Sequence, residues 1–127
     1  MPLRIKEEFR FARSCYGHLA GITGVKITQA LISKGCLQII DDHFILTKVG
    51  ETLFQELGIE RSSLAHIKTS KLCIDGTERR PHLAGHLGRL LLDCLMDKKW
   101  VVRKEQTRIL HITPMGKQQL SQYFGIK

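Results

Sequence analysis

The feature that most constrains this chain is an internal repeat. Residues 18–24 (HLAGITG) recur as residues 82–88 (HLAGHLG), and residues 44–50 (FILTKVG) recur in the same order as residues 110–116 (LHITPMG). Matches in the same order indicate that one supersecondary unit is present twice. A unit this short does not easily bury a stable core alone, so we expect the two copies to pack together about a pseudo-twofold axis.

Each copy is predicted to begin with one continuous helix. In the second copy, apolar residues recur at helical spacing from Leu83 to Leu95, and Pro81 suits the first turn of that helix. In the first copy, too few residues separate Val25 from Cys36 to form both helices of a helix-turn-helix. A single helix is therefore favoured at this position.

A two-stranded hairpin and a closing helix are expected to follow in each copy. The predicted strands cover 36–40, 43–46, 100–104 and 108–112. Threonine is a good N-cap and glycine a common helix stop, so Thr47 and Thr113 should begin the closing helices and Gly58 and Gly125 should end them.

Small residues gather at the start of both leading helices. They are Ala20, Gly21, Gly24, Ala84, Gly85 and Gly88. Glycine costs a helix about 1 kcal/mol relative to alanine, so these residues could simply loosen the helix starts. Because the pattern occurs twice, we expect instead that it lets the two helices pack closely against each other.

These patterns predict an α+β fold in which two pseudo-symmetric helix–β-hairpin–helix repeats, similar to winged helices, pack as a single domain over residues 1–127. We expect repeat one at about 15–59, a connector at about 60–72 and repeat two at about 73–127.

The charge balance favours an anionic partner. The chain has 20 Lys and Arg against 12 Asp and Glu, a net charge of +8, which suits nucleic acid but also an ordinary solvated surface. Candidate phosphate contacts are Arg79, Arg80, Arg103, Lys104 and Arg108, of which the last three lie around the tip of the second hairpin. No secretory signal or membrane-spanning run is found, so a soluble cytoplasmic protein with reduced thiols is expected.

Two cysteine and histidine pairs lie beside the repeated helix starts. These residues are Cys15, His18, Cys73 and His82. If the repeat brings both starts together, the four side chains suit zinc or another soft metal, although their spacing matches no standard zinc signature. The alternatives are a thiol sensor, a small-molecule effector pocket between the halves, or cysteines and histidines with ordinary packing roles. No nucleotide-binding loop, catalytic triad or carboxylate pair is present, so catalysis is not expected.

Two longer motifs carry a family resemblance. Residues 13–21 (RSCYGHLAG) and 73–85 (CIDGTERRPHLAG) resemble the region that follows the winged helix-turn-helix in one branch of the ArsR-type transcription regulators. The resemblance covers nearly the whole chain and implies transcription regulation. It does not imply that this piece itself binds the operator, because the DNA-reading domain of the family normally precedes this region. Gly17 and Gly76 depart from the family pattern, which has Asp and Trp there.

Three functions follow from these observations. The first is the regulatory, dimerisation or effector-sensing part of an ArsR-like regulator, acting as a homodimer and answering to a metal or small-molecule effector. The second is a basic winged-helix-like module that binds DNA directly through its hairpins. The third is a separate interaction protein that pairs with a complete regulator.

Overall fold

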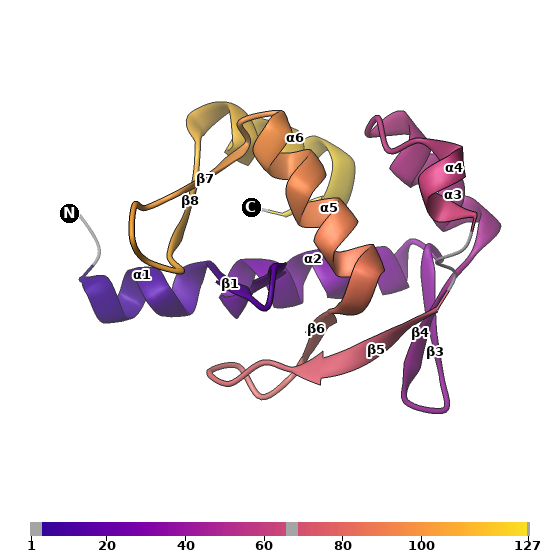
Figure 1. Ribbon diagram of the computed structural model, residues 1–127, viewed down its shortest axis with the longest axis horizontal. Coiled ribbons are helices and arrows are strands. Elements are labelled where there is room, and N and C mark those ends of the chain that lie inside the picture. Colours follow the sequence, from indigo (N-terminus) through magenta and orange to yellow (C-terminus); the bar gives the residue numbers. More distant parts are fainter. Residues whose placement is uncertain (1–3, 66–68, 127) are drawn as a thin grey trace.

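A computed structural model describes residues 4–65 and 69–126 (Figure 1). In the first copy the elements are β1 (Arg13–Cys15), β2 (His18–Ala20), α2 (Gly21–Ser33), β3 (Leu37–Ile40), β4 (His43–Leu46) and α3 (Lys48–Glu56). The second copy repeats them in order as β5 (Thr69–Ile74), β6 (Pro81–Leu83), α5 (Gly85–Asp97), β7 (Val101–Arg103), β8 (Leu110–Ile112) and α6 (Pro114–Phe124). Helix α1 (Ile5–Phe11) precedes the first copy, and α4 (Arg61–Leu64) lies between the copies.

The predicted α+β class and the winged-helix-like units are confirmed. Helix α2 is continuous, and both predicted hairpins form. The Thr47 and Thr113 hydroxyls accept hydrogen bonds from the N–H groups of Gly50 and Gly116, at 3.1 and 2.9 Å, and so cap α3 and α6 as expected. Gly125 ends α6 in the left-handed conformation.

Each copy also begins with a hairpin that the sequence did not predict. Strands β1 and β2 pair antiparallel, as do β5 and β6. The placement of Pro81 in the first turn of a helix is therefore wrong, because Pro81 is the first residue of strand β6 and helix α5 starts only at Gly85. Leu83 likewise lies in β6 rather than on the helical stripe. Strands β1, β2 and β6 are each only three residues long, which is too short to show a clear alternating pattern.

The predicted connector also has regular structure. Helix α4 falls within it, and β5 begins at Thr69, before the expected start of the second repeat. Residues 66–68 of the connector lie outside the described residues.

The two copies are joined by exchanged hairpins. The hairpin β3–β4 of the first copy pairs with the leading hairpin of the second, giving an antiparallel sheet in the order β3-β4-β5-β6 (Figure 1). In the opposite direction, the start of β8 bridges to β1 of the first copy: Ser14 N–H donates to Arg108 O at 2.7 Å, and Leu110 N–H donates to Ala12 O at 3.0 Å. Each copy therefore completes part of the other.

The helices follow the same exchange. Helix α2 packs on β6 and helix α5 packs on β2, so each leading helix covers a strand of the other copy. The Thr28 hydroxyl of α2 accepts a hydrogen bond from Leu83 N–H of β6 at 2.8 Å. A single cluster of buried apolar side chains contains residues from both copies, including Ile27, Phe44, Leu87 and Leu110. No helix of the described residues is both long and apolar enough to cross a bilayer.

Two of the helix-start glycines allow the close approach of a helix to a strand. A Cβ at Gly24 would collide with the Leu19 carbonyl of β2, and one at Gly88 would collide with the Leu83 carbonyl of β6. Gly88 also faces the Cβ of His18 in the other copy. The glycines thus seat each helix on its own preceding strand. That they also let the two leading helices pack closely against each other stays a prediction.

Substituting Gly24 tests this packing. Helix propensity alone would make Gly24→Ala stabilising by about 1 kcal/mol. Because the added methyl group meets the Leu19 carbonyl, we expect a loss of about 1–3 kcal/mol in the free energy of unfolding, measured by urea denaturation. The matched control is Gly76→Ala, where the nearest heavy atom, Arg13 Nη2, lies 3.9 Å from the added carbon. Equal stability of the two variants would contradict this account.

Candidate functional site

The two leading hairpins bring the four predicted cysteine and histidine side chains together. Cys15 lies directly opposite His18 across β1 and β2, and Cys73 lies directly opposite His82 across β5 and β6. The first hairpin turns through Tyr16 and Gly17, whereas the second turns through a longer loop. The two pairs are therefore equivalent in space, although their spacings in the sequence differ.

The four side chains form one compact cluster. One donor atom from each of Cys15, His18, Cys73 and His82 lies within 4.8 Å of the other three. The two Sγ atoms are 3.9 Å apart, and the imidazole ring centres are 5.0 Å apart. Both histidines are buried and both cysteines are half-buried. Two ring nitrogens, His18 Nδ1 and His82 Nε2, are buried without a hydrogen-bond partner.

The fully buried carboxylate of Asp75 supports this cluster from the loop of the second hairpin. Its Oδ1 lies 3.1 Å from His82 Nδ1 and accepts a hydrogen bond of 2.7 Å from the Gly21 N–H at the start of α2. Its Oδ2 accepts from Arg13 Nη2 at 3.2 Å and from the N–H of Glu78 at 3.0 Å. One carboxylate thus links the histidine of one copy to the helix start of the other.

These contacts determine the charge of Asp75. Burial opposes its ionisation, but the N–H groups of Gly21 and Glu78, the Thr77 hydroxyl and the Arg13 guanidinium outweigh that effect and hold the Asp75 pKa well below its usual range. An ionised Asp75 accepts a hydrogen bond from the N–H at His82 Nδ1, which leaves Nε2 of that ring as the atom with a free lone pair.

Burial controls the protonation of the cluster itself. It lowers the pKa of His18 to about 4, and the neighbouring His82 and Arg89 act in the same direction. Burial also lowers the pKa of His82, although Asp75 opposes this. Burial and the adjacent Cys15 raise the pKa of Cys73 to about 11. At neutral pH the cluster therefore offers neutral imidazoles and, for Cys73, a protonated thiol.

The loop that carries Asp75 also contacts α1. The Arg13 guanidinium donates to Phe9 O at 3.0 Å and to the Thr77 hydroxyl at 3.2 Å. Arg10 of α1 pairs with Glu78 at 2.9 Å. Asp75 itself binds the start of α2 in the other copy.

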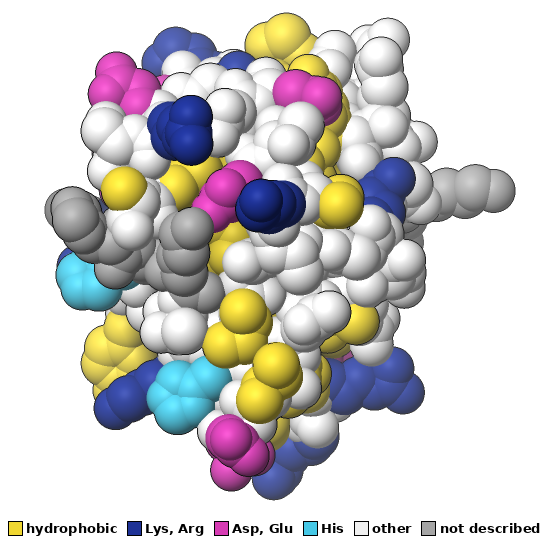
Figure 2. Space-filling model, turned by 90° about the vertical axis from the view of Figure 1, so that its right-hand side faces the viewer, with side chains coloured by type: hydrophobic (Ala, Val, Ile, Leu, Met, Phe, Trp, Pro, Cys, Tyr) yellow, Lys and Arg dark blue, Asp and Glu magenta, His cyan; other side chains and the backbone are white. Residues whose placement is uncertain are grey.

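The predicted phosphate contacts lie on two different hairpins. Arg79 and Arg80 are exposed on the loop next to the cluster. Around the tip of β7–β8, Lys104 lies 3.8 Å from Glu8 and the Arg108 guanidinium stacks over the Phe9 ring at 5.2 Å, so both contact α1. Arg103 is exposed. Figure 2 shows one face of the molecule, on which lysine and arginine side chains are scattered among other types rather than joined in one patch.

The departures at Gly17 and Gly76 fall on the turns of the two leading hairpins. Gly17 has φ +87°, and a Cβ there would lie 3.1 Å from Arg89 Nε. A larger residue at this position would therefore require both a strained backbone and movement of Arg89.

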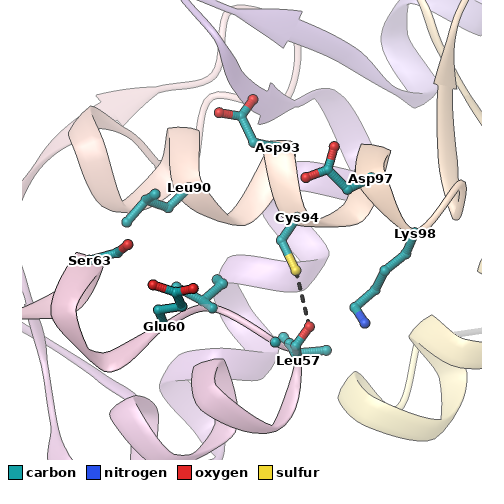
Figure 3. A pocket seen from close by; sticks show the side chains of 10 residues that line it. Leu57, Glu60, Ser63, Leu90, Asp93, Cys94, Asp97 and Lys98 are labelled. Carbon is teal, nitrogen blue, oxygen red and sulfur yellow. Dashed lines mark hydrogen bonds between the residues drawn. The ribbon is translucent and has the colours of Figure 1, made fainter.

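Five cavities among the described residues are lined by side chains other than those of the cluster. The space between the leading helices, lined by Leu19, Gly24, Leu83 and Gly88 among others, measures only about 10 Å³, which is too small for an organic effector. A larger open cavity lies between α4 and α5 (Figure 3). There the Cys94 thiol donates to Leu57 O at 3.2 Å, apart from the other half-buried thiols.

Comparison with known proteins gives one relative. The chain is 36% identical over 124 residues to the HTH-type transcriptional regulator YdfF of Bacillus subtilis (strain 168), a protein that is itself uncharacterized. The alignment covers 96% of this chain and 55% of YdfF, so the chain spans about half the length of that relative. No family model and no solved structure matches. The chain is thus similar to part of an HTH-type transcription regulator.

Removing the Asp75 charge should destabilise the protein. Asp75→Asn leaves the buried Arg13 guanidinium without its ion pair, and breaking such a pair typically costs about 3–5 kcal/mol. The matched control is Asp42→Asn, on the exposed turn between β3 and β4, where φ is +61° and asparagine is equally tolerated. Urea unfolding in the presence of a chelator measures both. A midpoint for Asp75→Asn equal to that of the control would contradict the role of this carboxylate.

Proposed function

We propose that this chain is the regulatory part of an ArsR-like, HTH-type transcription regulator, and that the cluster of Cys15, His18, Cys73 and His82 is its effector site. The similarity to YdfF over nearly the whole chain supports the regulator class. The motifs around the two cysteine and histidine pairs support the ArsR type.

The observation that carries the proposal is the position of the cluster. Each copy supplies one cysteine and one histidine, so a ligand bound there contacts both leading hairpins at once. Occupancy then favours one arrangement of the two copies over others, which is the differential binding that any effector needs. From His82 the change passes through Asp75 to the start of α2 and to Arg13, which contacts α1.

Direct DNA binding through the hairpins is the second candidate, and the exposed Arg103 and the net charge of +8 favour it. Two of the three basic residues at the tip, Lys104 and Arg108, are however engaged with α1. We therefore assign the regulatory role to this part of the protein and expect DNA to be read by a winged-helix domain or partner.

Transcript levels test the regulatory role. Cells that lack the gene should show altered amounts of a defined set of transcripts, measured by RNA sequencing. A gene copy with Cys73→Ser should fail to restore the normal amounts of these transcripts. A copy with Cys94→Ser, outside the cluster, should restore them. Full restoration by Cys73→Ser would refute the assignment of the effector site.

A mobility-shift assay separates the two candidates. At about 0.15 M salt, the isolated chain should not retard duplex DNA, because Lys104 and Arg108 near the hairpin tip are engaged with α1. Retardation that Arg103→Ala together with Arg108→Ala weakens would instead establish direct binding through the β7–β8 hairpin.

A further inference from the structure

We infer that the cluster is a closed tetrahedral site for one zinc-class ion, with Cys15, His18, Cys73 and His82 as its four ligands. This inference rests on the proposed function only for its regulatory consequence, because it names the occupant of the same site. The binding itself follows from geometry.

The distances match a tetrahedral site before any ion is added. Zinc–sulfur bonds of about 2.3 Å at the tetrahedral angle place two sulfur ligands about 3.8 Å apart. The Cys15 and Cys73 Sγ atoms are 3.9 Å apart. One donor atom of each histidine lies within 4.8 Å of both sulfur atoms and of the other histidine donor. A disulfide requires an S–S distance of about 2.05 Å, so the two cysteines are arranged as paired ligands rather than as a bond.

The buried ring nitrogens supply an independent observation. His82 is 1% exposed, and its Nε2 has no hydrogen-bond partner. His18 is also buried, and its Nδ1 has no hydrogen-bond partner either. Leaving a buried polar atom unsatisfied is unfavourable, and such atoms are rare in folded proteins. Here each copy supplies one such nitrogen and one thiol to the cluster. A cation bound by all four side chains explains both unsatisfied nitrogens.

Asp75 has the position of an outer-sphere partner of a metal-bound histidine. Histidine ligands almost always donate their second ring N–H to a carboxylate, a carbonyl or water, which fixes the ring and its tautomer. Here Asp75 Oδ1 lies 3.1 Å from His82 Nδ1 and directs Nε2 of that ring away from the carboxylate. Asp75 is therefore a positioning residue, which acts on the ion through His82.

The donor set selects the class of ion. Two sulfur and two imidazole donors suit zinc, whereas magnesium and calcium require oxygen ligands. Binding releases one proton from each thiol, and the two thiolates balance the charge of a divalent ion, which makes the filled site electrically neutral as burial requires. With four protein ligands no position is left for substrate, so the ion joins the two copies rather than catalysing a reaction.

Cobalt substitution tests the site directly. The full chain is purified with chelator and reductant, freed of chelator and titrated with Co²⁺. Intense visible bands of Co²⁺ report tetrahedral coordination, and a sulfur-to-cobalt band in the near ultraviolet reports thiolate ligands. We expect saturation at one ion per chain, displacement by Zn²⁺ and no effect of Mg²⁺. Cys15→Ser and Cys73→Ser should each abolish the sulfur-to-cobalt band, and Cys94→Ser should leave it unchanged.

Asp75→Asn tests the positioning role. It should keep the cobalt spectrum, because all four ligands remain, but weaken Zn²⁺ binding about 10–100-fold. Circular dichroism monitors the folding of every variant. Thermal unfolding of the unmodified chain is a second test that needs no variant. Its midpoint temperature should rise with Zn²⁺ and fall with chelator. Absence of both the cobalt band and this shift would overturn the inference.

The outcomes keep the two proposals separate. If the chain binds one ion as described but Cys73→Ser restores normal transcript control, the metal site stands and the proposed function fails. If no ion binds although Cys73→Ser still abolishes the transcript response, the proposed function stands and the metal assignment is wrong.

Discussion

The carboxylate of Asp75 lies where the two halves of the molecule meet, and much of the structure depends on its hydrogen bonds. It binds the start of α2, the guanidinium of Arg13 and the ring of His82 at the same time. A buried charge is stable only when it is paired and hydrogen-bonded, so these groups must be held together for Asp75 to remain ionised. The loop between β5 and β6 carries that carboxylate.

Exchange of hairpins between the copies explains why such short elements fold. Strand β4 pairs with β5, β8 bridges to β1, and each leading helix covers a strand of the other copy. A two-stranded hairpin is marginally stable alone, but here each one is extended or covered by the other half. The buried apolar cluster is therefore shared, and neither copy keeps its core without the other.

The same exchange makes the junction suitable for regulation. The cysteine and histidine pairs sit on the two leading hairpins, and Asp75 connects them to α2 and, through Arg13, to α1. Under the proposed function, a ligand at the cluster would act on elements of both copies without a large cavity. This is consistent with the very small space between the leading helices.

The sequence by itself determined the duplication, the continuous α2, the second hairpin of each copy and the threonine caps, because these depend on neighbouring residues. Tertiary structure decided the leading hairpins, whose short strands have no clear pattern, and therefore the true position of Pro81. The sequence indicated the four cysteine and histidine residues, but the tertiary structure decided that they meet, because Cys73 and His82 face each other only when β5 and β6 pair. Likewise, the partner of Asp75 lies in the other copy, and no local signal specifies such a contact.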